Sequence, residues 1–317
     1  MNGTVGRPEK VGRPKHFAIT GVAGFVAPRH LQAIHETNNE LVAACDPHDA
    51  VGLLDRYGYD TAYFREFERF DRYLEKLRRN KDPRAIDYLS ICSPNYLHDA
   101  HIRLALRLRA DAICEKPLVL NPWNCDALEE LEREYGKKIY TILQLRLHPS
   151  VVALREQLRR TERAGRPQVE LAYITARGPW YRYSWKGNLE QSGGLATNIG
   201  IHFFDLLLWL FGPAKGAEVE LSEPAKVRGR LELERADVRW NLSIDVADLP
   251  AACREQGRTT YRSIRVDGQE LEFSSGFADL HSESYRQILA GRGFGIAEAR
   301  PSIELAHRIR QATAKLG

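Results

Sequence analysis

The sequence lacks the features that mark several protein classes. Its cysteines are odd in number and show no C-x-x-C spacing, so we expect neither a disulfide framework nor a metal site; they are Cys45, Cys92, Cys114, Cys125 and Cys253. No apolar run reaches the length needed to cross a bilayer, and residues 1–15 lack the apolar segment of a signal peptide. We therefore expect a soluble protein of the cytoplasm that begins with a mobile tail over residues 1–15.

A concentrated charge of one sign is also absent. The chain has 46 Lys and Arg against 42 Asp and Glu, which gives a net charge of +4 at pH 7, and the basic residues are interleaved with acidic ones. Nucleic-acid binding is disfavoured because it requires a clustered basic surface. A small anionic ligand would suit this balance.

The first part of the chain alternates between short apolar runs and segments with helical spacing. The strand-like runs cover residues 16–21, 40–47, 85–94, 111–117 and 138–147, and the helix-like segments cover 27–37, 67–80, 96–110 and 122–136. This alternation predicts a parallel sheet with helices on both faces, hence an α/β Rossmann domain over residues 16–145. At 317 residues the chain has room for about two such units.

After about residue 146 the pattern changes. A long strand-like run at 168–178 precedes a strongly apolar helix at 195–212, several strand-like runs follow between 216 and 275, and helices are expected at 279–291 and 300–316. Successive strands usually pair antiparallel. The sequence therefore predicts an α+β domain over residues 146–317, with a mainly antiparallel sheet and helices on one side.

A glycine turn joins the first strand to the first helix. Gly21, Gly24 and Ala27 form G-x-x-G-x-x-A, one residue longer than the dinucleotide fingerprint G-x-G-x-x-G. Asp46 ends the second strand, where a carboxylate can accept hydrogen bonds from adenosine ribose hydroxyls and would repel a 2′-phosphate. We expect NAD to lie over this turn, against Phe25 and Val26. The alternative is an ordinary strand–turn–helix in which Asp46 starts a turn.

Two further segments could carry chemistry. Lys116 follows Glu115 at the end of the fifth strand, where the ligand crevice of a parallel sheet lies. Asn198, His202 and Asp205 have the spacing of one helix face, and a histidine is the usual base for a hydroxyl proton. The alternatives are a surface lysine and a histidine packed in the core.

These segments together resemble the glucose–fructose oxidoreductase/inositol dehydrogenase family. The resemblance rests on the glycine turn followed by His30 and on CSPNYLH, CEKPL and GG…NIGIHFFD. It implies an NAD(P)-binding Rossmann domain and a second domain whose open sheet supplies substrate and oligomer contacts, in a dimer or tetramer. It assigns catalysis to Lys116 and His202, and adds cofactor contacts from Ser93, Asn95, His98, Glu115 and Gln144. Many family members carry aspartate where this chain has Asn198.

A closer resemblance is to the bacterial UDP-2-acetamido-2-deoxyglucuronate 3-dehydrogenases of that family. It is carried by CEKPLVLNPWNCDAL, QLRLHP, SWKGN…SGGLATNIGIHFFD and DLHSESYRQILAGRGFG. The resemblance implies oxidation of the sugar's C3 hydroxyl to a ketone, in a route to surface polysaccharide. It also implies that some members recycle bound cofactor with 2-oxoglutarate.

A UDP-uronate carries two phosphates and a carboxylate, which arginine and lysine bind. The candidate substrate residues are Arg146, Arg177, Tyr181, Lys186, Thr197 and Asn198, with His148 and Arg182 nearby. Arg177 and Lys186 are favoured over Arg182, and an exposed basic loop is the alternative. Two other functions stay open: another sugar, inositol or dihydrodiol dehydrogenase, and a regulator that senses NAD without chemistry. The presence of both Lys116 and His202 disfavours the regulator.

Overall fold

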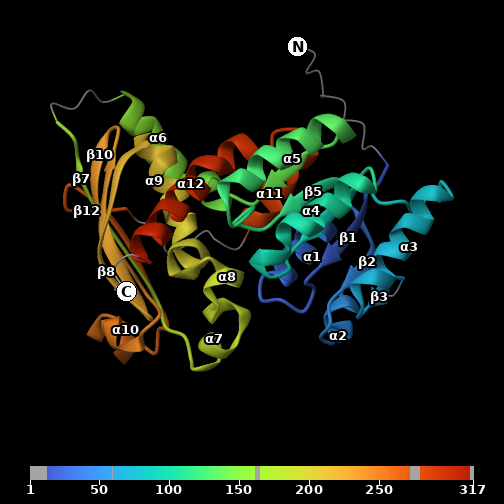
Figure 1. Ribbon diagram of the computed structural model, residues 1–317, viewed down its shortest axis with the longest axis horizontal. Coiled ribbons are helices and arrows are strands. Elements are labelled where there is room, and N and C mark those ends of the chain that lie inside the picture. The colour runs from blue at the N-terminus through green and yellow to red at the C-terminus, as the bar shows by residue number, and fades with distance from the viewer. Residues whose placement is uncertain (1–12, 59, 161–164, 272–278, 315–317) are drawn as a thin grey trace, which may run out of the picture.

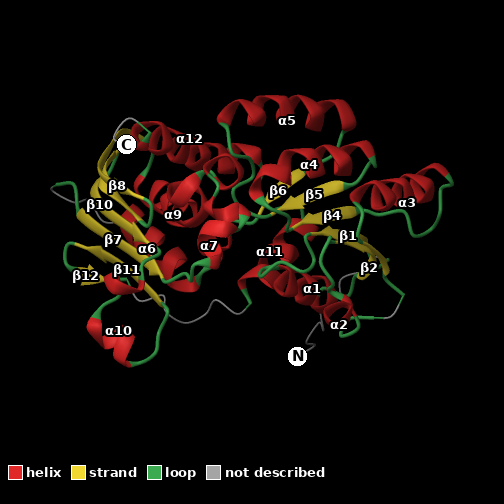
Figure 2. Ribbon diagram, turned by 60° about the horizontal axis from the view of Figure 1, so that its bottom comes forward, coloured by secondary structure: helices red, strands yellow, loops and turns green. Residues whose placement is uncertain are grey.

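The computed structural model describes residues 13–58, 60–160, 165–271 and 279–314 (Figure 1). Most of the expected N-terminal tail lies outside these residues. Two six-stranded sheets stand side by side, and helices fill the space between them (Figures 1 and 2).

The first sheet is parallel throughout, as predicted. Its order is β3-β2-β1-β4-β5-β6, the Rossmann order, and its strands are β1 (His16–Thr20), β2 (Glu40–Cys45), β3 (Ala62–Phe64), β4 (Tyr88–Ile91), β5 (Asp111–Cys114) and β6 (Ile139–Thr141). A 3₁₀ turn, Gln144–Leu147, follows β6. Most residues of β1, β2, β4 and β5 are buried, as expected for a parallel sheet that is covered on both faces.

Helices cover both faces of this sheet (Figure 2). On one face lie α3 (Phe67–Arg79), α4 (His98–Arg107) and α5 (Pro122–Tyr135), and on the other lie α1 (Ala27–Glu36) and the short α2 (Val51–Leu54). The apolar spacing sets the contact face: in α3, the side chains of Phe70, Leu74 and Leu77 are buried while the charged residues between them face solvent.

The second sheet is mixed and mostly antiparallel, as predicted. Its order is β12-β11-β7-β10-β9-β8, and only β7 and β10 pair in parallel; the strands are β7 (Gln168–Thr175), β8 (Ala214–Glu223), β9 (Lys226–Leu233), β10 (Ala236–Ser243), β11 (Thr260–Val266) and β12 (Gln269–Glu270). Its inner face packs against α6 (Pro149–Arg160), α9 (Ile201–Phe211) and α12 (Ile296–Thr313) (Figure 1). Three short helices lie at its ends: α7 (Trp180–Tyr183), α8 (Leu189–Ser192) and α10 (Ala251–Glu255).

The last part of the chain returns to the first sheet. In α11 (Leu280–Leu289), Tyr285 and Ile288 pack in one cluster with Phe17 and Ile113 of the Rossmann strands. The N-terminal half of α12 packs in the first core, and its C-terminal half packs in the second. A division at residue 145 therefore describes the two sheets, while α11 packs with the Rossmann unit and α12 ties both units together.

One apolar segment is longer than the sequence analysis allowed. Residues 189–211 form a helical stretch of 23 residues that contains an 18-residue window of mean hydropathy 1.4, long and apolar enough by composition to cross a membrane, so the expectation that no such run exists was wrong. Within the protein 78% of that window is buried, which is the behaviour of a core helix.

A buried ion pair links the first sheet to the helices of the second. Arg146, just after β6, donates from Nε to Oδ2 of Asp205 at 2.9 Å and from Nη2 to Oδ1 at 2.6 Å, and Asp205 lies on α9. The same Nη2 donates to the backbone oxygen of Glu298 on α12 at 2.9 Å. The two side chains are only 8% and 3% exposed. Arg146 therefore joins the 3₁₀ turn after β6 to both α9 and α12.

Removing the carboxylate should destabilise the fold strongly. In Asp205→Asn the buried guanidinium loses its counter-ion, which costs about 3–5 kcal/mol in comparable pairs. Urea unfolding followed by circular dichroism measures the loss. The control is the uncharged double variant Arg146→Met/Asp205→Leu, which should recover most of it because both charges are gone. Equal stability of Asp205→Asn and the unaltered protein would contradict this role.

Candidate active site

The glycine turn after β1 is shaped by close backbone contacts. Gly21 has φ +75°, and a Cβ there would stand 2.5 Å from the backbone of Cys92 and Ser93. Its N–H donates to the Cys45 oxygen at 2.8 Å, and the Gly24 N–H donates to the Gly21 oxygen at 3.0 Å. No side chain caps the first turn of α1. The Ala27 and Arg29 N–H groups bond to the Gly24 and Val26 oxygens, and residue 28 is proline, so the positive end of the α1 dipole and the backbone of the glycine turn are what this segment offers to a pyrophosphate.

The flanks of the turn differ in exposure. Phe25 is 87% exposed, whereas Val26 is half-buried and packs beside the cluster around Leu31. Phe25 is therefore open to a molecule lying over the turn, and Val26 mainly supports the backbone.

Asp46 lies directly against this turn. Its Oδ2 accepts the Ala23 N–H at 3.0 Å and its Oδ1 accepts the His48 N–H at 2.9 Å. Each carboxylate oxygen has two lone pairs, so one on each stays available to a ribose hydroxyl. Arg65, which the sequence analysis missed, donates to the Pro47 oxygen at 3.2 Å. Arg65 directly follows β3, so the fold brings it beside Pro47, the residue after Asp46.

The loop after β4 is bound to its neighbours. Both ring nitrogens of His98 meet backbone oxygens, that of Pro117 at 2.6 Å and that of Ser93 at 2.9 Å. The Asn95 amide donates across to the Ser192 oxygen of α8 at 3.0 Å. In this structure His98 and Asn95 therefore position the loops around the cofactor crevice. Both ring nitrogens of His98 are thus engaged by the backbone, and Asn95 uses its amide nitrogen.

His101 supports the same loop and was not predicted. Its Nδ1 lies 2.9 Å from Ser93 Oγ and 3.1 Å from Thr20 Oγ1, and its ring stacks on Phe67. Burial lowers the pKa of His101 to about 4, so the ring is neutral and its contacts are ordinary hydrogen bonds. A helical spacing from His98 was the available signal, but nothing in the sequence showed which histidine faced the loop.

Lys116 reaches from the first unit to the second. Its Nζ donates to the Asn198 backbone oxygen at 3.1 Å, and the Asn198 amide donates to the Tyr181 hydroxyl at 2.7 Å. Asn198 and the buried Thr197 lie in a π-helical turn, Ala196–Gly200, that leads into α9 and His202. Such turns are frequent at functional sites. The structure thus brings together the predicted catalytic lysine and the helix that carries the predicted base.

Charge and burial set the protonation states of these two groups. Burial, then the charge of Lys116, holds the pKa of His202 well below its usual range, so its imidazole is neutral and can accept a proton. Burial also lowers the pKa of Lys116, and the like charges of Lys186 and Arg177 lower it further while Glu115 opposes them. Lys116, Lys186 and Arg177 therefore form one positively charged cluster.

Aromatic rings flank this cluster. Lys186 Nζ lies 5.2 Å from the ring centres of both Trp180 and Trp185, and burial lowers the pKa of Lys186. Arg177 is exposed, and Arg182 is exposed with no part in the described cluster. Of the three basic residues proposed in this segment, Arg177 and Lys186 therefore lie near Lys116.

The segment QLRLHP supplies less than was predicted. Arg146 is occupied by Asp205 and the Glu298 backbone, so this structure gives it a structural role in place of the expected substrate contact. His148 is buried, and its Nδ1 accepts the Ser150 N–H. Gln144 is buried, and its Oε1 has no hydrogen-bond partner among the described residues, as befits an amide that meets a ligand.

Glu115 lies in a buried polar cluster beneath Lys116. Its Oε1 is 3.0 Å from His30 Nε2 and 3.0 Å from His281 Nε2, and its Oε2 accepts the Lys116 N–H at 3.2 Å. In this arrangement Glu115 and His30 are internal groups. His281 was missed because it lies 166 residues further along the chain.

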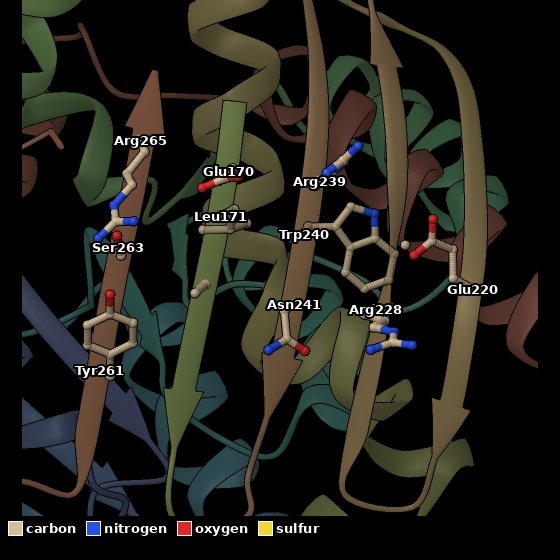
Figure 3. A pocket seen from close by; sticks show the side chains of 12 residues that line it. Glu170, Leu171, Glu220, Arg228, Arg239, Trp240, Asn241, Tyr261, Ser263 and Arg265 are labelled. Carbon is tan, nitrogen blue, oxygen red and sulfur yellow. The ribbon is translucent and has the colours of Figure 1, made fainter. Parts of the chain in front are cut away.

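A shallow hollow lies elsewhere, on the outer face of the second sheet (Figure 3). Its lining comes from β7 to β11 and includes Glu170, Glu220, Arg228, Arg239 and Arg265. Burial alternates along β9 and β10, with the buried side chains toward the helices and these charged ones away from them. The hollow contains none of the predicted catalytic or cofactor residues.

Comparison with known proteins agrees with this geometry. Residues 15–142 match an oxidoreductase family with an NAD-binding Rossmann fold, and residues 167–247 match the C-terminal alpha/beta domain of that family. The chain is similar to the WlbA (WbpB) dehydrogenase from Thermus thermophilus, solved with NAD and alpha-ketoglutarate, at 54% identity and TM-score 0.89, over 93% of this chain and 94% of that one. The complex of that dehydrogenase with NAD and UDP-GlcNAcA aligns at 53% identity and TM-score 0.89 over the same shares.

A curated relative is more distant. D-glucoside 3-dehydrogenase of Escherichia coli is 29% identical over 215 residues, which are 63% of this chain and 54% of that protein. The chain thus spans about half the length of this relative.

Asp46 should set the choice of cofactor. In Asp46→Asn the charge that repels a 2′-phosphate is lost while Arg65 stays close, so NADP should bind more tightly relative to NAD. Loss of a hydrogen bond to a charged group costs about 1.5–3 kcal/mol, which corresponds to NAD binding weaker by roughly tenfold or more. Calorimetric titration with each dinucleotide measures both effects.

The matched control is Asp49→Asn, which removes a carboxylate that accepts only the Val51 N–H nearby. An unchanged ratio of NAD to NADP affinity in Asp46→Asn would show that this carboxylate does not contact the ribose.

Proposed function

Because the chain belongs to the glucose–fructose oxidoreductase/inositol dehydrogenase (Gfo/Idh/MocA) family, we propose that it is an NAD-dependent sugar dehydrogenase. Its proposed reaction is oxidation of the C3 hydroxyl of UDP-2-acetamido-2-deoxy-D-glucuronate to the 3-keto sugar. The observation that carries this proposal is the 54% identity, over nearly the whole chain, to a dehydrogenase that has been solved with NAD and, in a second complex, with UDP-GlcNAcA.

The charge of the site supports an anionic substrate. After burial, the charges of Lys186 and Arg177 lower the pKa of Lys116, and the charge of Arg177 lowers the pKa of Lys186, so the free protein bears a repulsion among these cations. A carboxylate or phosphate placed among them removes this repulsion and gains charge-assisted hydrogen bonds. An uncharged sugar would leave the repulsion in place. The cluster therefore favours a uronate linked to a nucleotide over a neutral sugar.

The chain's own residues would divide the chemistry between them. His202, neutral because it is buried beside Lys116, accepts the proton of the C3 hydroxyl. The Asn198 backbone oxygen holds the Lys116 ammonium toward the second unit. From there the ammonium donates a hydrogen bond to the C3 oxygen of the sugar as negative charge develops on that oxygen. Bound NAD supplies the hydride acceptor, and the glycine turn and Asp46 are the groups that would hold it.

A second half-reaction with a 2-oxo acid is part of the proposal. The Thermus thermophilus dehydrogenase has been solved with alpha-ketoglutarate, a dicarboxylate that the same three cations would suit. Reduction of its ketone to a 2-hydroxy acid would consume the hydride and return the proton held on His202, so the site would be restored without exchange of the cofactor. The 3-keto sugar is then the substrate that an aminotransfer step needs, as in surface polysaccharide synthesis.

We also propose that the chain is a homo-oligomer of the cytoplasm. Among the described residues, α6, α9 and α12 lie on one side of the second sheet, and no helix is drawn over its other face (Figure 1). That face carries charges of both signs, which a two-fold-related copy can pair. Light scattering of the full chain tests the assembly, and cell fractionation tests the location.

The substrate can be tested directly. Incubation of the protein with UDP-2-acetamido-2-deoxyglucuronate and 2-oxoglutarate should give a product lighter by two hydrogens, together with 2-hydroxyglutarate, both detected by mass spectrometry. UDP-N-acetylglucosamine, which lacks the carboxylate, is the control and should not react. Oxidation of both sugars would remove the role given to the cations, and oxidation of neither would point to another sugar or inositol.

Replacement of either catalytic residue should remove turnover and keep cofactor binding. We expect His202→Asn to lower kcat by about 10²–10⁴-fold and Lys116→Ala by about 10²–10³-fold, because one loses the base and the other the charge that stabilises the alkoxide. The affinity for NAD, measured by calorimetry, should change little. Lys215→Ala, an exposed change on β8, is the control. Full activity in either variant would contradict its role.

A further inference from the structure

The carboxylate next to the catalytic lysine is held by histidines from two distant helices. His30 lies on α1, beside the glycine turn, and His281 lies on α11 near the end of the chain. Both Nε2 atoms are 3.0 Å from the same Oε1 of Glu115, and all three side chains are buried. The mechanism proposed above does not use either histidine.

The hydrogen bonds around His30 fix where the protons lie. A carboxylate only accepts, so the proton on His30 lies on Nε2 and Nδ1 becomes an acceptor. The Tyr285 hydroxyl, 2.8 Å from this Nδ1, then donates to it, and Ser90, 2.6 Å from the same hydroxyl, donates to Tyr285. In this series of hydrogen bonds from Ser90 to Glu115, each donor has an acceptor when the His30 ring is neutral. Burial also lowers the pKa of His30, which agrees with a neutral ring.

His281 donates to the same carboxylate oxygen. Its Nδ1 is buried without a hydrogen-bond partner among the described residues, and its Nε2 carries the proton that Glu115 accepts, because a carboxylate cannot donate. Glu115 thus receives two imidazole N–H groups on one oxygen and the Lys116 backbone N–H on the other. Although burial acts against it, the hydrogen bonds from His281 and His30 hold the pKa of Glu115 well below its usual range.

This carboxylate is the negative charge that acts on Lys116. The charged or titratable groups around Glu115 are His30, His281, Tyr285, Cys92, Cys114 and Lys116, and burial keeps both thiols and the phenol neutral. Around Lys116 they are His98, His202, Lys186 and Arg177, of which two are like charges. In a buried acid–base pair, the proton can pass to the carboxylate and leave both groups neutral.

We propose that His30 and His281 are positioning residues that keep Glu115 ionised, so that its charge retains the proton on Lys116 where the substrate hydroxyl binds. The catalytic use of the Lys116 proton rests on the proposed function, but the effect of Glu115 on the titration of Lys116 can be measured without a substrate. The same three side chains could bind a divalent cation in principle. The 3.0 Å separations and the donor chain from Ser90 to His30 are those of hydrogen bonds and favour the proposal.

The test measures the titration of Lys116 itself. The full chain is labelled with ¹³Cε-lysine, and the Lys116 signal, identified by its loss in Lys116→Arg, is followed against pH by NMR. In Glu115→Gln the midpoint should fall by about one unit, because the negative charge of the neighbouring residue, which raises the pKa of Lys116, is lost. In His281→Leu the Lys116 midpoint should fall by less. In His281→Gln, which restores an N–H donor to Glu115, the midpoint should return toward that of the unaltered protein.

Ser282→Ala is the matched control, because Ser282 is the buried neighbour of His281 on α11 and bonds only to Glu36 in this structure. The alkaline limb of kcat should move to lower pH in the same order as the midpoints, which a purely structural defect would not do. The proposal would be overturned by an unchanged Lys116 midpoint in Glu115→Gln, or by a midpoint in His281→Leu equal to that in Ser282→Ala. One equivalent of metal on the purified protein would also overturn it. Shifted midpoints without turnover of the UDP-uronate would uphold it and count against the proposed function.

Discussion

A positive charge has to be kept in a buried place, and the structure is arranged around that constraint. Lys116 lies at the carboxyl end of β5, where the first sheet faces the second unit, and two further cations lie near it. An ammonium group in such surroundings tends to lose its proton. The buried carboxylate of Glu115 opposes this tendency, and α1 and α11 supply the groups that bind the carboxylate. The adjacent residues Glu115 and Lys116 therefore link the packing of α1 and α11 to the charge of the site.

This link accounts for the course of the chain after the second sheet. A chain that only needed two packed units could end after β12. Instead α11 returns to the first core, where Tyr285 and Ile288 pack with the Rossmann strands and His281 reaches Glu115. The helix α12 then crosses both cores and accepts a hydrogen bond from Arg146. The C-terminal helices thus help to fix the geometry of a site whose proposed catalytic residues, Lys116 and His202, come from earlier elements.

The sequence was sufficient for what depends on local pattern. Alternating apolar runs predicted the parallel sheet, helical spacing over residues 67–80 predicted α3, and the change of pattern near residue 146 predicted the second sheet. It was insufficient where a side chain had two possible partners. Arg146 could serve a ligand or a buried acid, and only the packing of α9 against the 3₁₀ turn decided for Asp205. His281 and Arg65 had no local signal, because their partners lie far away in the sequence.

Asn198 shows how one uncharged side chain can serve this arrangement. An aspartate there would place a negative charge one turn before His202, which would raise the pKa of the imidazole and compete with Glu115 for influence on Lys116. The asparagine instead donates its amide to Tyr181, while its backbone oxygen accepts from Lys116. Glu115 is then the only carboxylate whose charge lowers the cost of protonating Lys116 among the described residues, and burial keeps His202 neutral. The placement of charges thus gives the two groups of the proposed reaction opposite protonation states. The carboxylate of Glu115 favours a protonated Lys116, and the ammonium of Lys116 favours a neutral His202.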